Sequence, residues 1–267
     1  MGKIGLVAGG GGLPVLFAQE AKARGDKVVG FGLKGLTAKE LEAVVDKMHW
    51  FEWGQLQKAL FALGIARVNK VVLLGKIKKT LIFQNEKNLD EKARGIFKKL
   101  SDKNDYSILK AIEGALKKIG IGLIDAADYL GGLMPAKGLL TKRPPDGREE
   151  KDIEIGSNMA RELAKFDTGQ TVCVKDGCAV ALEGAEGTDE TIRRAGALSG
   201  GGFTVVKMAR PNQDMRFDIP LIGLLTLKTL IEAKATALAL EARKTILMDR
   251  EELIALADRS GISIVVI

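Results

Sequence analysis

Residues 3–14, KIGLVAGGGGLP, decide the fold that this sequence predicts. The apolar run at its start is typical of a buried strand, and four consecutive glycines follow it. Leu13 and Pro14 then begin a helical pattern that extends to Arg24, with the proline in the first helical turn, where it is tolerated. A second strand at 27–32 completes a βαβ unit. Its glycine loop directs backbone N–H groups at an anion, although a purely structural glycine turn explains the loop equally well.

The glycine loop does not match the fingerprint of a nicotinamide-cofactor site. Pro14 stands where the third glycine of that fingerprint belongs. The second strand ends in Phe31-Gly32-Leu33, with no acid that could bind a ribose hydroxyl. This pattern disfavours an oxidoreductase and leaves a phosphate or uridine cradle formed by Gly10, Gly11, Gly12 and Leu13.

Strands and helices alternate along the chain, which predicts a parallel sheet with right-handed crossovers. The first half has predicted helices at 38–46, 55–63 and 104–118 and strands at 48–51, 70–74 and 120–124. The second half has predicted helices at 152–166, 190–197, 223–233 and 250–260, a hairpin at 171–182, and strands at 202–208 and 262–267. We therefore predict an α/β protein with an N-terminal Rossmann-like parallel-sheet domain at 1–134, a linker at 135–148 and a second α/β domain at 149–267.

Composition narrows the classes of function. The 267 residues carry a formal net charge of +7 without a polybasic tail, so a polyanionic ligand or an anionic membrane surface is favoured over nucleic acid. Lysines alternate with apolar residues at 76–104, which predicts a solvated amphipathic helix or, alternatively, a lipid-contacting surface. No apolar run is long enough to cross a bilayer and no signal segment is visible, so we expect a cytoplasmic protein whose membrane contact is peripheral.

Histidine and cysteine are too few for a zinc site of the usual kind. His49 is the single histidine, and its aromatic neighbours predict a packed side chain rather than a catalytic base. Cys173 and Cys178 are the two cysteines, and we expect both to be small buried strand residues in a reducing compartment.

Residues 207–223, KMARPNQDMRFDIPLIG, which we call the late motif, combine acids and bases in a loop after a predicted strand. Open α/β sheets place ligand sites in such loops. Asp214 and Asp218 are suited to hold a divalent cation, and the basic side chains Lys207, Arg210 and Arg216 are suited to hold phosphate oxygens. A turn with a solvated Asp–Arg pair is the other explanation of this pattern.

A second acidic cluster, EGAEGTD at 183–189, lies at another strand-to-helix junction. Thr188 and Asp189 are good helix-start residues, so capping alone explains them. If this loop meets the late one, however, Glu186 and Asp189 would join Asp214 and Asp218. Four carboxylates in one site require a cation to offset their repulsion.

Three motifs in order carry a family resemblance: GLVAGGGGLP at 5–14, ALEGAEGTDETIRRAG at 181–196 and KMARPNQDMRFDIPLIGLLT at 207–226. Together they resemble the UDP-2,3-diacylglucosamine pyrophosphatases of lipid A biosynthesis that are unrelated to calcineurin-like phosphoesterases. The resemblance covers essentially the whole chain. One segment departs from it, since DKNDYSIL at 102–109 stands where an acidic, leucine-rich stretch is expected.

The resemblance implies a hydrolase that depends on Mg²⁺ or another divalent cation such as Mn²⁺. Its substrate would be a lipid-linked nucleotide sugar, and its products UMP and 2,3-diacylglucosamine 1-phosphate (lipid X). It also implies a homodimer at the inner-membrane surface and places a catalytic aspartate in the late motif, at Asp214 or Asp218. The predicted site then has metal ligands Asp214, Asp218, Asp189 and Glu186, and phosphate- or substrate-binding residues Gly10, Gly11, Gly12, Leu13, Thr188, Lys207, Arg210, Gln213 and Arg216. A non-catalytic lipid or nucleotide-sugar carrier is the alternative.

Overall fold

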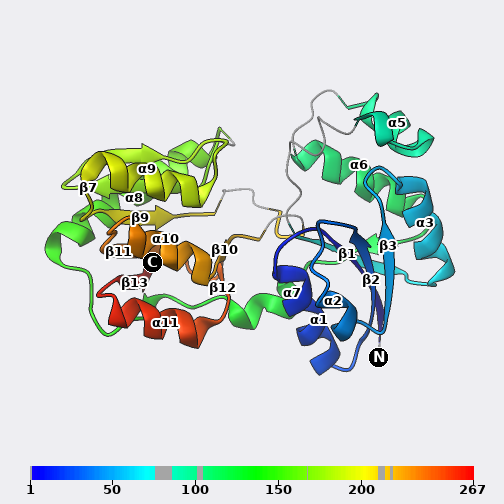
Figure 1. The fold of residues 1–267 in the computed structure, drawn as a ribbon, viewed down its shortest axis with the longest axis horizontal. Helices are drawn as coiled ribbons and strands as arrows, with labels where there is room; N and C mark the ends of the chain where they lie inside the picture. The colour runs from blue at the N-terminus through cyan, green and yellow to red at the C-terminus, as the bar shows by residue number, and fades with distance from the viewer. Residues whose placement is uncertain (1, 76–85, 101–104, 167, 210–213, 217–218) are drawn as a thin grey trace. The chain divides into compact units, whose positions relative to one another are not determined.

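The computed structural model describes residues 2–75, 86–100, 105–166, 168–209, 214–216 and 219–267 (Figure 1). The chain divides into two compact units. The first comprises Met1–Leu130 with Asp214–Asp218, and the second comprises Gly131–Gln213 with Ile219–Ile267. In the described ranges, no helix is both long and apolar enough to cross a membrane.

The first unit contains the predicted parallel sheet. Its five strands lie in the order β3-β2-β1-β4-β5, and every pair is parallel. Their bounds are β1 (Lys3–Ala8), β2 (Lys27–Leu33), β3 (Lys47–Phe51), β4 (Lys70–Leu74) and β5 (Gly122–Leu123). The chain runs outward from β1 to β3 on one side and returns to β4 on the other. The strand order therefore reverses between β1 and β4, which is where doubly wound sheets bind ligands.

Helices cover both faces of this sheet (Figure 1). The helices of this unit are α1 (Leu13–Ala23), α2 (Leu41–Val44), α3 (Leu56–Ile65), α5 (Glu91–Phe97), α6 (Asp105–Lys117) and α7 (Ala127–Leu130), with a 3-10 turn η1 (Glu86–Asn88). Of these, α5 packs on α3 rather than on the sheet. Leu63 of α3 and Leu116 of α6 pack on Val29, Phe31, Val71 and Leu73 of the strands. α1 packs on the other face and buries Phe17 completely. The predicted helix at 38–46 is shorter than expected, because Val45 has an extended backbone that leads into β3.

The second unit has a mixed six-stranded sheet in the order β6-β13-β11-β9-β7-β8. The strands are β6 (Gly138–Leu139), β7 (Thr171–Lys175), β8 (Cys178–Leu182), β9 (Thr204–Lys207), β11 (Ala237–Leu240) and β13 (Ser263–Val266), and a separate parallel pair joins β10 (Leu221–Ile222) to β12 (Ile246–Leu247). The central strands β9, β11 and β13 are parallel, whereas β6, β7 and β8 pair antiparallel. Cys173 is buried, but Cys178 is exposed because it directly follows the hairpin turn, so the expectation that both are buried is wrong for Cys178.

Helices also cover both faces of the second sheet. The helices are α8 (Gly147–Ala164), α9 (Thr188–Ser199), α10 (Leu224–Glu232) and α11 (Arg250–Arg259), preceded by a 3-10 turn η2 (Gly131–Leu133). α9, α10 and α11 bury Ile192, Leu227 and Leu253 in one core, and α8 packs Ile153 and Ala160 into the other. α8 approaches β9 closely at Gly156, where an added Cβ would lie 2.6 Å from a methyl of Val206.

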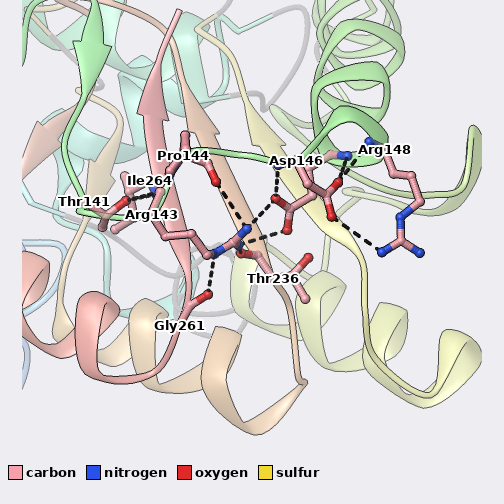
Figure 2. A network of polar contacts seen from close by, with 9 residues as sticks. Thr141, Arg143, Pro144, Asp146, Arg148, Thr236, Gly261 and Ile264 are labelled. Carbon is pink, nitrogen blue, oxygen red and sulfur yellow. Dashed lines mark hydrogen bonds and ion pairs between the residues drawn. The ribbon is translucent and has the colours of Figure 1, made fainter.

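The predicted linker at 135–148 includes β6, which pairs with β13, so its described residues are part of the second unit. Figure 2 shows how Arg143 holds this segment: its guanidinium donates to the carbonyls of Gly261 (2.9 Å) and Thr236 (2.5 Å). It also forms a two-pronged ion pair with Glu149 at 2.7 and 2.9 Å. Asp146 accepts from the first backbone N–H groups of α8 and completes a capping box with Glu149.

Candidate active site

The glycine loop lies at the carboxyl ends of β1 and β4, the point where the strand order of the first sheet reverses. The backbone N–H of Gly9 donates to the carbonyl of Leu74 at 2.7 Å, which fixes the start of the loop. Gly75 follows β4 with φ +98°, and a Cβ there would lie 2.8 Å from the carbonyl oxygen of Gly10. Glycine is thus required at position 75 for the two strand ends to approach each other.

The loop leads directly into the amino end of α1. Gly12 precedes the helix, Pro14 occupies its first turn, and no acid stands in that turn. Free backbone N–H groups at a helix start favour an anion. Nearby, the buried hydroxyl of Thr37 donates to the carbonyl of Ala8 at 2.6 Å and ties the segment after β2 to the end of β1. The predicted residues Gly10, Gly11, Gly12 and Leu13 therefore lie at the edge of this sheet where its strand order reverses, and their binding of a ligand stays a prediction.

In the second unit, two predicted site residues from different motifs contact each other. Lys207 is the last residue of β9 and is only 7% exposed, and its Nζ donates to Oγ1 of Thr188 at 2.7 Å. The Thr188 hydroxyl, at the start of α9, donates to Oε1 of Glu183 at 3.1 Å. The structure thus places a cation and a hydroxyl together where β9 ends and α9 begins.

Glu186 and Asp189 each have protein partners in the same loop region. Arg194 Nη2 lies 2.6 Å from Glu186 Oε1. The pKa of Glu186 is lowered by hydrogen bonds from its own backbone N–H and from Arg194, so it is ionised at neutral pH. Thr226 of α10 donates to Asp189 Oδ1 at 2.8 Å.

Asp214 and Arg216 belong to the first compact unit, although the sequence around them lies between β9 and β10 of the second. Arg216 donates from Nε and Nη2 to the two oxygens of Asp214, at 2.8 and 2.6 Å. This two-pronged contact lowers the pKa of Asp214. Arg216 Nη1 also donates to Glu113 Oε1 on α6 at 3.0 Å. Sequence reasoning did not single out Glu113.

The remaining predicted residues are not tested by this geometry. Arg210, Gln213 and Asp218 lie outside the described residues. Within the described ranges, no group of three or more His, Cys, Asp and Glu side chains could hold a metal ion. Asp214, Glu186 and Asp189 each bind other protein groups instead. The described carboxylates do not form a metal shell on their own, and the four-carboxylate set stays a prediction.

The single histidine is packed, as its aromatic surroundings suggested. His49 stacks on Phe31 of the neighbouring strand, with ring centroids 5.3 Å apart. Burial lowers its pKa, which favours the neutral ring at pH 7.

Comparisons with known proteins identify the family of this chain. Residues 3–133 match the family model described as LpxI N-terminal domain, and residues 136–265 match that of the LpxI C-terminal domain. The chain belongs to the LpxI family. It is 30% identical to the UDP-2,3-diacylglucosamine pyrophosphatase LpxI of Caulobacter vibrioides, over 98% of this chain and 96% of that protein.

Solved structures resemble this LpxI-family chain only weakly. A nucleoside-diphosphate-sugar epimerase from Pseudomonas aeruginosa is 14% identical with a TM-score of 0.27, covering 99% of this chain and 88% of its own. The biotin carboxylase domain of Hydrogenobacter thermophilus 2-oxoglutarate carboxylase is 12% identical with a TM-score of 0.30, covering 67% of this chain and 36% of its own. Similarity at this level says nothing about the function of this chain.

The two LpxI family models meet at residues 133–136, close to the change of compact unit after Leu130. Asp214 and Arg216 are the exception to this division. They fall within the match to the C-terminal domain, yet they belong to the first compact unit.

Proposed function

We propose that this chain hydrolyses the pyrophosphate bond of UDP-2,3-diacylglucosamine, releasing UMP and 2,3-diacylglucosamine 1-phosphate in lipid A biosynthesis. The observation that carries the proposal is its similarity, over 98% of its length, to a relative of that name, together with both LpxI family matches. The three motifs that resemble the family fall in described elements at β1–α1, β8–α9 and, in part, β9–α10.

The geometry is suited to a substrate rich in phosphate. The glycine loop at the reversal between β1 and β4 offers backbone N–H groups to an anion. Lys207 with Thr188, and Arg216, supply further donors. Hydrolysis of a pyrophosphate develops negative charge on the bridging and leaving oxygens, and cations fixed in advance stabilise that charge.

The acids of the late motif would supply the remaining chemistry. Asp214 and Asp218 are proposed to orient the attacking water or to bind a divalent cation, with Arg210 and Gln213 contacting substrate oxygens. Mg²⁺, or another cation such as Mn²⁺, would neutralise phosphate oxygens when bound, with Glu186 and Asp189 as further ligands. The described members of this set accept hydrogen bonds from Arg216, Arg194 and Thr226, and a carboxylate can keep such a partner while another of its lone pairs binds a metal.

Location and assembly are part of the same proposal. A diacylated substrate resides in a membrane, and a net charge of +7 favours an anionic surface. We place the enzyme in the cytoplasm, peripheral on the inner membrane, as a homodimer. The predicted basic segment at 76–104 lies partly outside the described residues, and its described part forms η1 and α5.

Release of UMP from purified UDP-2,3-diacylglucosamine tests the proposal. The full chain is assayed with Mg²⁺, with Mn²⁺ and with EDTA, beside Asp218→Ala and the control Asp128→Ala, which changes an exposed acid of α7. Metal-dependent release that is lost in Asp218→Ala and kept in Asp128→Ala is expected. Binding of the lipid without UMP release in any metal would instead identify a carrier.

A further inference from the structure

Glu113 joins α6 to the late motif. Its Oε1 accepts from Arg216 Nη1 at 3.0 Å, across 103 residues of sequence. It also pairs with two lysines of its own helix, Lys110 at 3.1 Å and Lys117 at 3.0 Å. The side chain of Glu113 is nevertheless buried, since the residue is only 4% exposed.

Burial of Glu113 makes the loss of this contact costly. A carboxylate removed from water is costly unless cations and hydrogen bonds compensate it. Three cations do so here, and they lower the pKa of Glu113 to about 2, with the hydrogen bond from Lys117 as the largest cause. Glu113 is therefore charged at any physiological pH, and Arg216 always faces an anion on α6.

Arg216 is held from two sides by this arrangement. Nε and Nη2 donate to Asp214, and Nη1 donates to Glu113. Because the guanidinium is planar and its donors have a fixed geometry, two carboxylates in contact with it define its orientation. Residues 214–216 are also the only described stretch after Leu130 that the first unit contains. Glu113 is thus an anchor that fixes this segment on the first unit.

We propose that Glu113 is a positioning residue for the hydrolysis. It orients the Arg216 guanidinium and, through Arg216, the Asp214 carboxylate. This inference rests on the proposed function for its catalytic consequence, whereas the anchoring itself does not depend on it. Small displacements of a catalytic group are sufficient for a large effect, since a shift of about 1 Å can lower a rate about 100-fold.

The kinetic test is a double-mutant cycle on UMP release with Glu113→Gln, Arg216→Ala and the double variant. Glu113→Gln keeps the size of the side chain and removes its charge. Glu149→Gln is the matched control, because Glu149 is 6% exposed and also ion-paired, but with Arg143 in the second unit. We expect Glu113→Gln to lower kcat on the order of 10- to 100-fold with a smaller change in KM. In the Arg216→Ala background, Glu113→Gln should lower kcat by less than about twofold, because the effect of Glu113 on the reaction passes through Arg216.

Hydrogen exchange of the peptide that spans 214–216 measures the anchor without any activity. Exchange should accelerate in Glu113→Gln and remain at the wild-type rate in Glu149→Gln. An unchanged exchange rate or a wild-type kcat in Glu113→Gln would overturn the role of Glu113. So would a loss of kcat in the double variant equal to the product of the losses in the two single variants. A wild-type chain that releases no UMP would instead refute the proposed function and the catalytic part of this inference with it.

Discussion

Replacing Gly75 by alanine tests whether the close approach of β4 to the glycine loop matters for the site. Gly75 has φ +98°, and an added Cβ would lie 2.8 Å from the Gly10 carbonyl oxygen and 2.8 Å from the Gly9 carbonyl carbon. The loop cannot simply yield, because the Gly9 N–H donates to Leu74. Gly120 is the matched control: its φ is +75°, but its added Cβ meets no atom within 4 Å.

Both substitutions carry the cost of a positive φ for alanine, on the order of 1–3 kcal/mol. Gly75→Ala carries in addition the overpacking against loop backbone, again about 1–3 kcal/mol. For a chain of this size each kcal/mol lowers Tm by about 2–4 °C, so Gly75→Ala should melt roughly 2–12 °C below Gly120→Ala. Displacement of the loop should also raise KM for UDP-2,3-diacylglucosamine in Gly75→Ala alone.

Thermal unfolding followed by circular dichroism, with UMP release at a temperature where both variants are folded, gives the two readouts. Equal Tm values for the two variants would refute the steric argument. A lower Tm for Gly75→Ala with an unchanged KM would show that the loop is structural and does not contact the substrate.

Two further predictions concern charge. Lys207→Met should lower kcat/KM about 100-fold because it removes a fixed cation. The control Lys175→Met removes contacts to two backbone carbonyls and should lower Tm but leave turnover near wild type. Similar losses of turnover in both variants would refute a specific role of Lys207. The pKa of Tyr129 is raised from 10.0 to about 12, first by burial and then by its hydrogen bond to Asp26, so its contribution to stability is complete below pH 10 and is lost between pH 10 and 12. The unfolding free energy of Tyr129→Phe should therefore fall less steeply than that of the wild type between pH 10 and 12. It is measured by urea denaturation at each pH, and the same pH dependence in both proteins would contradict this role of Tyr129.

Much of the fold followed from the sequence because its local signals agree with the tertiary structure. The apolar run before the glycines, the strand at Lys70–Leu74 and the Asp176-Gly177 turn all lie where predicted. The central strand β11 was missed. Its residues, Ala237–Leu240, are fully buried, but two of the four are alanines, so they lack the β-branched and aromatic character that marks a strand.

The candidate site was less predictable, since it depends on contacts between distant segments. Thr188 and Lys207 could both be proposed as phosphate-binding residues because each follows a predicted strand, and the structure joins them by one hydrogen bond. Glu113 offered no such signal. With Lys110 and Lys117 at i−3 and i+4, it has the spacing of an ordinary surface ion pair on a helix. Only the contact with Arg216 distinguishes it.

That contact also bears on which part of the chain can be active alone. A fragment that ends at Leu130 would retain the glycine loop and α6 but would lose Asp214 and Arg216. Of its ion-pair partners among the described residues, Glu113 would then keep the two lysines of its own helix. The rest of the chain would retain Thr188 and Lys207 but would present Arg216 without its partner on α6. Cutting the chain after Leu130 therefore separates Glu113 from Arg216, and the anchoring proposed here requires both segments.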